Sequence, residues 1–173
     1  MSQIEIPYEE AKKEIIEAIE ERHLKILATS SNYVSAREVR FVSDGLKMFF
    51  FTDSNSRKYK QILENPKVAV AVGNLQIEGE ASIKGSPKDE GNSKYFEIFK
   101  RKQPDWYKYW VDSGNLELPN LKVIEVVPSR ISMYKTRAFD KVPESYYLLL
   151  NVDKQKAYRM SYEDLFEAPA YNE

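Results

Sequence analysis

The chain has 173 residues, which suits one domain with a sizeable hydrophobic core. Its 26 Lys and Arg nearly balance 27 Asp and Glu, so a net charge of -1 gives no general attraction for nucleic acid or anionic membranes. The absence of cysteine excludes disulfides, thiol catalysis and cysteine-based zinc sites, and a single histidine leaves no His-rich metal site.

The beginning of the chain shows no targeting signal. Met1 to Pro7 is neither basic nor followed by an apolar core, so no signal peptide is predicted. No segment approaches the roughly 18 consecutive apolar residues that a membrane-spanning helix needs. We therefore expect a cytoplasmic protein without a membrane or nucleic-acid partner.

The first predicted elements are a helix and a β-hairpin. Residues 8–22 form an amphipathic pattern with Ala11, Ile15 and Ile19 on one side. Strands are predicted over 24–31, 34–42 and 46–52, and Asp44-Gly45 is a strong hairpin signal between the last two. Because residues 46–52 are apolar on both faces, we expect the core to cover one face and a partner subunit the other.

A short helix predicted over 56–65 begins with a basic turn. Ser56 is a good N-cap, and Asn65-Pro66 ends the helix. Arg57 and Lys58 oppose the helix dipole there, but an anion bound at the helix start would make both favourable. Arg37, which shares a strand face with apolar Val39, also favours an anionic partner.

Not every charged residue nearby is expected to matter. Glu38 and Arg40 fall on the opposite strand face from Arg37, and substitution of Arg40 is expected to change little. The lone histidine, His23, is assigned to the end of the first helix and given no catalytic role.

The rest of the chain is predicted to be mainly β. Strands are expected over 68–72, 75–84, 121–127 and 130–135, with a turn at Pro128-Ser129 and a bulge or close backbone approach at Gly79. Helices near 92–112 hold several aromatics, including Trp106 and Trp110. An appended hairpin spans 146–152 and 157–160, and a short helix is expected in 161–173. All of this is interpreted as one domain, residues 1–173, with its core over about 24–135.

The motifs in this order are similar to those of one known family. Arg37-x-Val39, Phe51-Thr52, Ser56-Arg57-Lys58 and Asn65-Pro66-x-Val68 resemble the pyridoxamine 5′-phosphate oxidase-like, FMN-binding split-barrel proteins. The resemblance is strong over about residues 24–84, looser to about 135 and weak beyond.

The resemblance implies both a fold and a site. The fold is mainly β (α+β): a six- to seven-stranded antiparallel split β-barrel with Greek-key character and flanking helices. It implies a homodimer with FMN at the interface and a small-molecule redox substrate. The implied FMN-binding residues are Arg37, Val39, Phe51, Thr52, Ser56, Arg57, Lys58 and Gln76. Phe51, Gln76 and a tryptophan such as Trp110 would lie near the flavin ring, and no catalytic residue is assigned.

The function stays open between several alternatives. The chain resembles an FMN-dependent oxidoreductase, a non-catalytic flavin-binding stress or sensor protein, or the same barrel holding the deazaflavin F420. Because no histidine follows residue 120, the basic substrate clamp of the true pyridoxamine phosphate oxidases is missing, and that activity is not predicted. The only histidine lies outside the motifs, which argues against haem.

Overall fold

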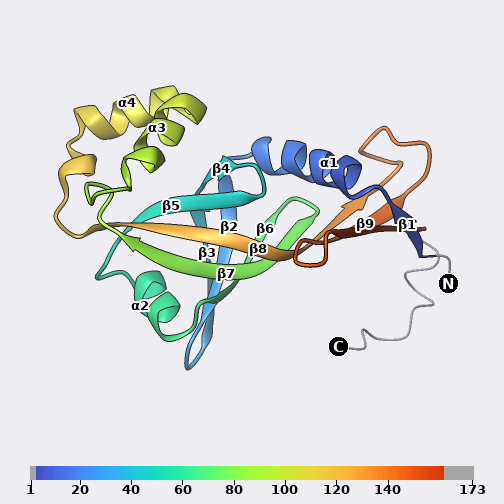
Figure 1. Ribbon diagram of the computed structural model, residues 1–173, viewed down its shortest axis with the longest axis horizontal. Helices are drawn as coiled ribbons and strands as arrows, with labels where there is room; N and C mark the ends of the chain where they lie inside the picture. Colours follow the sequence, from blue (N-terminus) through green and yellow to red (C-terminus); the bar gives the residue numbers. More distant parts are fainter. Residues whose placement is uncertain (1–2, 162–173) are drawn as a thin grey trace.

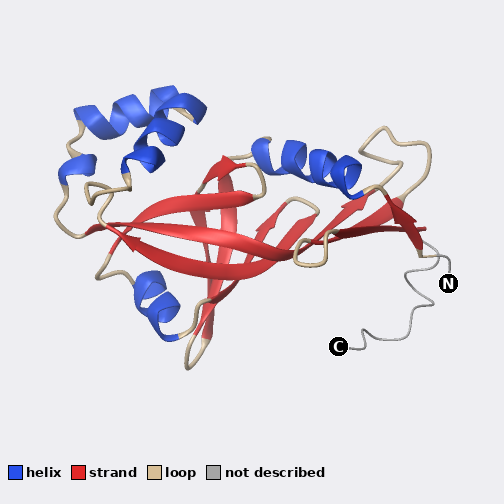
Figure 2. Ribbon diagram, viewed as in Figure 1, coloured by secondary structure: helices blue, strands red, loops and turns tan. Residues whose placement is uncertain are grey.

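The computed structural model describes residues 3–161. More of these residues lie in antiparallel strands than in helices, and the helices lie at the periphery (Figures 1 and 2). In chain order the elements are β1 (Ile4–Ile6), α1 (Tyr8–Glu20), β2 (Leu24–Ser30), β3 (Val34–Arg40), β4 (Val42–Asp44), β5 (Lys47–Asp53), α2 (Arg57–Glu64), β6 (Lys67–Val72), β7 (Leu75–Gly85), α3 (Ser93–Lys102), α4 (Pro104–Asp112), the 3₁₀ turn η1 (Asn115–Glu117), β8 (Leu121–Lys135), β9 (Tyr146–Asn151) and β10 (Lys156–Ser161).

The strands form one strongly curved sheet that does not close. Its order is β1-β10-β9-β8-β7-β6-β2-β3, while β5 pairs with β8 and with β4. Every pair is antiparallel. This confirms the predicted mainly β split barrel, with β3 left at one end of the path and therefore with an open edge.

Some strands pair with different neighbours along their length. Two of the predicted strand boundaries differ from the structure for this reason. The predicted strand 34–42 is divided at Phe41, because β3 pairs with β2 whereas β4 pairs with β5. The turn predicted at Pro128-Ser129 was wrong, because β8 runs unbroken from Leu121 to Lys135.

Pro128 fits inside a strand here because it lies where β8 changes partner. β5 pairs with β8 as far as Val126, and β9 begins pairing at Arg130. The missing N–H of Pro128 therefore costs no hydrogen bond to β5 or β9. The register against β7 also shifts here, beside Gly79, and a Cβ at Gly79 would clash with the backbone of Val127 and Pro128. The predicted bulge at Gly79 is thus present.

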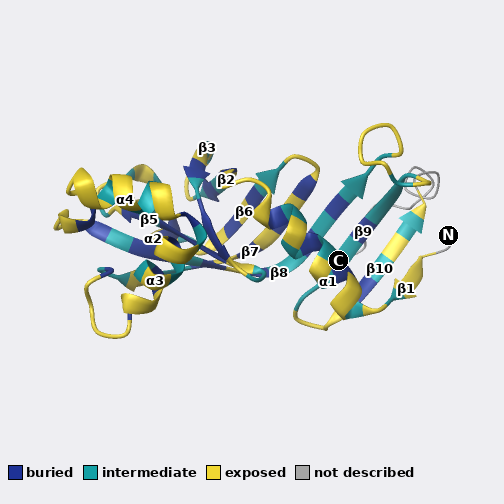
Figure 3. Cartoon of the chain, turned by 90° about the horizontal axis from the view of Figure 1, so that it is seen from above, coloured by how far each residue is buried: buried dark blue, intermediate teal, exposed yellow. Residues whose placement is uncertain are grey.

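Two hydrophobic clusters lie on the two faces of β5. Met48 and Phe50 belong to the main core inside the barrel, which also includes the buried side of α1. Phe49 packs on the other face with Tyr95 and Phe99 of α3. The second face is therefore covered by α3 and α4 of the same chain, and it gives no support for a partner subunit. Figure 3 shows the buried residues alternating along the strands.

The C-terminal hairpin was predicted correctly, and it is attached to α1. Glu14 forms ion pairs with Lys135 at 3.3 Å and Arg159 at 3.7 Å, and it accepts a hydrogen bond from the Tyr146 hydroxyl. β1, which was not predicted, pairs with β10. The helix expected in 161–173 falls almost wholly outside the described residues. Within residues 3–161, no helix is long and apolar enough to cross a membrane.

Candidate functional site

The N-terminus of α2 is built by two hydroxyl side chains. Ser56 caps the helix, and its Oγ accepts a hydrogen bond from the Tyr59 N–H at 3.4 Å. The same Oγ lies 3.0 Å from Thr52 Oγ1 at the end of β5. This contact ties the helix start to the strand end. The predicted pair of Thr52 and Ser56 is therefore brought together.

Arg37 reaches this site from β3 through a network of neutral acceptors. Its guanidinium donates to Thr29 Oγ1 at 2.6 Å, to Ser35 Oγ at 2.5 Å and to the Leu27 carbonyl at 3.2 Å. It also donates to Gln61 Oε1 of α2 at 3.2 Å. The side chain is thus held between the β2–β3 hairpin and α2, and its charge is not neutralised by these partners.

Gln61 is the residue that joins the β2–β3 hairpin to α2, and no sequence pattern pointed to it. Its side chain is buried, with 3% exposed. Oε1 accepts from Thr29 and Ser35 hydroxyls, each at 2.7 Å, and Nε2 donates to the Tyr33 carbonyl at 3.0 Å. Through its hydrogen bond with the Arg37 guanidinium, Gln61 helps to orient that side chain.

Three positive charges meet at this place. Desolvation, followed by repulsion from Arg57, lowers the pKa of Arg37. Desolvation and repulsion from Arg37 likewise lower the pKa of Lys58, against a smaller opposing effect of Asp53. None of the salt bridges among residues 3–161 involves Arg37, Arg57 or Lys58. An uncompensated cluster beside a helix N-terminus is a site for an anion.

A cavity of about 230 Å³ adjoins the cation cluster at Lys58. Val39 and Phe51, both predicted site residues, lie in its wall, and Trp106 and Trp110 from α4 complete it. The Phe51 ring contacts the Trp110 ring with centroids 5.5 Å apart. A second cavity of similar volume lies on the other side of these two rings, next to Thr52. The first cavity therefore joins an anion site to an aromatic wall.

Gln76 lies apart from the other predicted residues. It is exposed on β7, opposite Ala71 of β6, which in turn pairs with Ile26. Arg37 instead shares the inner face with Leu27, its cross-strand partner. Within one chain, Gln76 and Arg37 are thus on opposite faces of the sheet.

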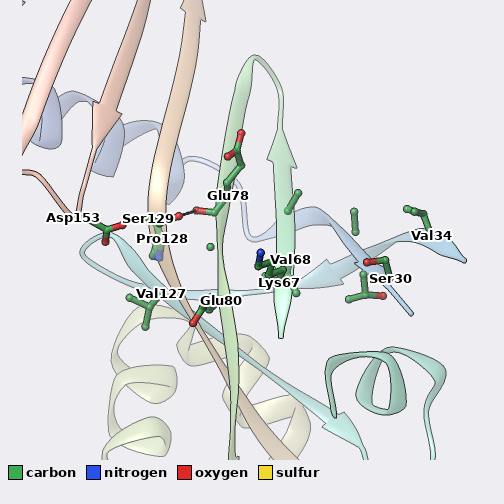
Figure 4. Close-up of a pocket in the computed structure, with 14 residues that line it drawn as sticks. Ser30, Val34, Lys67, Val68, Glu78, Glu80, Val127, Pro128, Ser129 and Asp153 are labelled. Carbon is green, nitrogen blue, oxygen red and sulfur yellow. Dashed lines mark hydrogen bonds between the residues drawn. The ribbon is translucent and has the colours of Figure 1, made fainter. Parts of the chain in front are cut away.

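The outer face near Gln76 contains a larger groove, of about 710 Å³, which includes none of the predicted site residues (Figure 4). Small residues form its floor, among them Ala28, Ala69 and Gly79. Val34 and Val127 lie at its sides, with the carboxylates of Glu78, Glu80 and Asp153. The charged residues that line the groove are mainly carboxylates, so the cation site is the better candidate for a cofactor that carries a phosphate. No group of His, Cys, Asp or Glu in residues 3–161 is arranged to hold a metal ion.

Comparison with known proteins identifies the family and the fold. The sequence profile of the pyridoxamine 5′-phosphate oxidase family matches residues 11–135. No curated protein matches the chain. Among solved structures, general stress protein 26 from Bacillus anthracis is similar with 22% identity and a TM-score of 0.55, over 85% of this chain and 100% of that one.

Two other structures extend the comparison of the fold. Campylobacter jejuni ChuZ aligns with a TM-score of 0.66 and 12% identity, over 95% of this chain and 66% of its own. A pyridoxamine 5′-phosphate oxidase-related, FMN-binding protein from Nostoc punctiforme aligns with a TM-score of 0.52 and 15% identity, over 89% and 92% of the two chains. Since the family profile covers well over half of the sequence, this chain belongs to the pyridoxamine 5′-phosphate oxidase family.

Proposed function

We propose that this protein binds FMN and acts as a flavin-dependent oxidoreductase on a small-molecule substrate. The observation on which the proposal rests is the cluster of Arg37, Arg57 and Lys58, which forms no salt bridge within residues 3–161 and lies at the start of α2. A phosphate monoester is the anion whose charge and size best match three cations, two hydroxyl groups and free helix N–H groups.

The fit to FMN is supported by what surrounds the phosphate site. Ser56 and Thr52 supply hydroxyls beside the cations, where a ribityl chain has its own hydroxyls. Lys58 connects the cluster to the cavity lined by Val39, Phe51 and Trp110, which offers aromatic surface for a planar ring. β3 ends the path of the sheet, so its open edge has backbone N–H and C=O groups for the polar rim of a flavin.

The flavin and the protein would have separate roles, as in other flavoproteins. Bound flavin supplies the hydride or electron transfer. The residues of this chain bind the phosphate, orient the ring against Phe51 and Trp110 and exclude water from one side of it. No catalytic residue is proposed.

Binding is tested by titrating the purified protein with FMN and following flavin fluorescence. Arg37→Ala and Arg57→Ala should each weaken FMN binding at least tenfold, because a charge-assisted hydrogen bond contributes roughly 1.5–3 kcal/mol. Riboflavin, which lacks the phosphate, should bind parent and variants alike. Lys60→Ala, an exposed cation one turn along α2, is the matched control and should bind FMN like the parent.

Two results would contradict the proposal. Equal FMN affinity of parent, Arg37→Ala and Arg57→Ala would show that the phosphate binds elsewhere. An absorbance spectrum of the purified protein that matched F420, with no response to added FMN, would assign the site to the deazaflavin. If FMN binds but is never turned over with reduced nicotinamides and candidate acceptors, the stress or sensor function takes the place of the enzyme.

We also propose a homodimer, on grounds different from those the sequence suggested. The outer face of β2 and β3 leaves large apolar side chains exposed, including Ile26 at 42% and Val34 at 74%. A second copy packed on this face would cover them, and Gln76 lies on the same outer side. Light scattering should give about twice 20.2 kDa at micromolar concentration. Val34→Lys should shift the protein towards the monomer, and a stable monomeric parent would contradict the proposal.

A further inference from the structure

Arg40 lies in the wall of the proposed flavin cavity, although the sequence analysis assigned it no role. It is the last residue of β3, and its guanidinium lies over the Trp106 ring, 4.2 Å from the centroid. It also donates to Gln103 Oε1 at 3.4 Å. Both partners come from the α3–α4 segment, far away in the sequence, so the alternation of a single strand could not reveal the contact.

These contacts hold Arg40 in place without neutralising it. Gln103 is 4% exposed and is itself fixed, because its Nε2 donates to the Phe41 carbonyl at 2.7 Å. Trp106 offers a cation–π surface. No salt bridge among residues 3–161 includes Arg40. The cation is therefore oriented by a neutral amide and an aromatic ring.

The cavity as a whole is positive. Arg40 and Lys58 line it against one carboxylate, that of Glu38, which is exposed. When a phosphate neutralises the neighbouring cluster, Lys58 is shared with that anion, but Arg40 is not part of the cluster. Arg40 is then the cation in the cavity that is free to interact with a negative charge on the flavin ring.

We propose that Arg40 is a positioning residue that raises the reduction potential of the bound flavin by stabilising its anionic reduced form. The inference rests on the proposed FMN site. Two-electron reduction with uptake of one proton leaves the flavin with one additional negative charge, and a nearby fixed cation favours that product over the oxidised ring. The electrons come from an external reductant, and Arg40 itself neither gains nor loses a proton.

The test is a redox titration of the FMN-loaded full-length protein with dithionite, in the presence of an indicator dye of known potential. Arg40→Gln should shift the equilibrium at least tenfold towards oxidised flavin, which is about 30 mV more negative for a two-electron couple. Arg40→Lys, which keeps the charge, should recover most of the potential. Arg101→Gln removes an exposed arginine of α3 and should leave the potential unchanged.

The pH dependence provides a readout that a purely structural role would not change. Uptake of one proton with two electrons gives half the slope of potential against pH that two protons give. The pH at which the slope halves should be higher in Arg40→Gln, because the anionic form is less favoured.

The possible failures are distinguishable. If Arg40→Gln binds FMN and keeps both the parent potential and the parent pH profile, the inference is wrong while the proposed function stands. The same conclusion follows if Arg40→Gln loses FMN affinity with no change in potential. A parent protein that binds no FMN overturns the proposed function, and this inference with it. Circular dichroism and thermal unfolding of each variant verify that the fold is kept.

Discussion

Substitution of Gln61 by leucine is expected to destabilise the fold, although leucine matches the buried position in size. Gln61 makes four hydrogen bonds: with Thr29, Ser35, Arg37 and the Tyr33 carbonyl. Each neutral bond contributes about 1 kcal/mol, and the bond to Arg37 roughly 1.5–3 kcal/mol. The sum of these four contributions is an upper limit on the loss in the free energy of unfolding.

The expected loss is smaller than that sum, because every partner keeps another contact. The Thr29 and Ser35 hydroxyls still accept from Arg37, and the Tyr33 carbonyl still accepts from the Ser31 N–H at 3.3 Å. Burial of the leucine side chain also offsets part of the loss. We expect the free energy of unfolding to fall by about 2–3 kcal/mol, a large share of a total that is typically ~5–15 kcal/mol.

Urea unfolding followed by tryptophan fluorescence measures this loss. With a slope of roughly 1–3 kcal/mol per molar urea, the midpoint should fall by about 1 M or more. Lys60→Leu, at an exposed position of the same helix, controls for the change in helix propensity and should stay close to the parent. A Gln61→Leu midpoint equal to that of Lys60→Leu would refute the reasoning that this amide joins α2 to the β2–β3 hairpin.

Two further predictions concern buried sites. Lys25 is 2% exposed, and burial lowers its pKa from 10.5 to about 8, so the unfolded chain binds more protons between these values and stability should rise with pH from about 8 to 10. Lys25→Met should abolish that rise, measured by thermal unfolding at several pH values, and should increase stability at pH 7. If the stability of the parent protein stays flat or falls between pH 8 and 10, the charged lysine is not desolvated. Gly79→Ala should cost about 1–3 kcal/mol, because the new Cβ meets the backbone of Val127 and Pro128, which cannot yield as a flexible side chain would. At Gly73 an alanine Cβ would meet no other atom, so Gly73→Ala is destabilised only by its positive φ of 56°. Calorimetry that found Gly73→Ala less stable than Gly79→Ala would contradict this reasoning.

The local elements of this protein were predictable because short stretches of sequence determine them. Ser56 and Asn65-Pro66 define the ends of α2, which spans Arg57–Glu64. Gly45, with φ of 64°, forms the hairpin turn that Asp44-Gly45 indicated. Alternation placed Arg37 on the inner face beside Val39. Thr52 and Ser56 lie side by side as expected, since they are only a short loop apart.

Tertiary structure decided the features that depend on neighbours distant in sequence. Pro128 looked like a turn, but its missing N–H is harmless where β8 changes partner from β5 to β9, a fact about pairing and not about local sequence. The second face of β5 suggested a partner subunit, yet α3 covers it through Tyr95 and Phe99.

The same limit applies inside the candidate site. The contacts of Gln61 and Arg40 were not predicted because their partners lie on other elements, between 24 and 66 positions away in the chain. Periodicity assigns a residue to a face, but it does not say what the fold brings opposite that face. The sequence by itself determined the family motifs and the elements that carry Arg37, Thr52 and Ser56, whereas packing of α3–α4 over the barrel decided which cation lines the adjoining cavity.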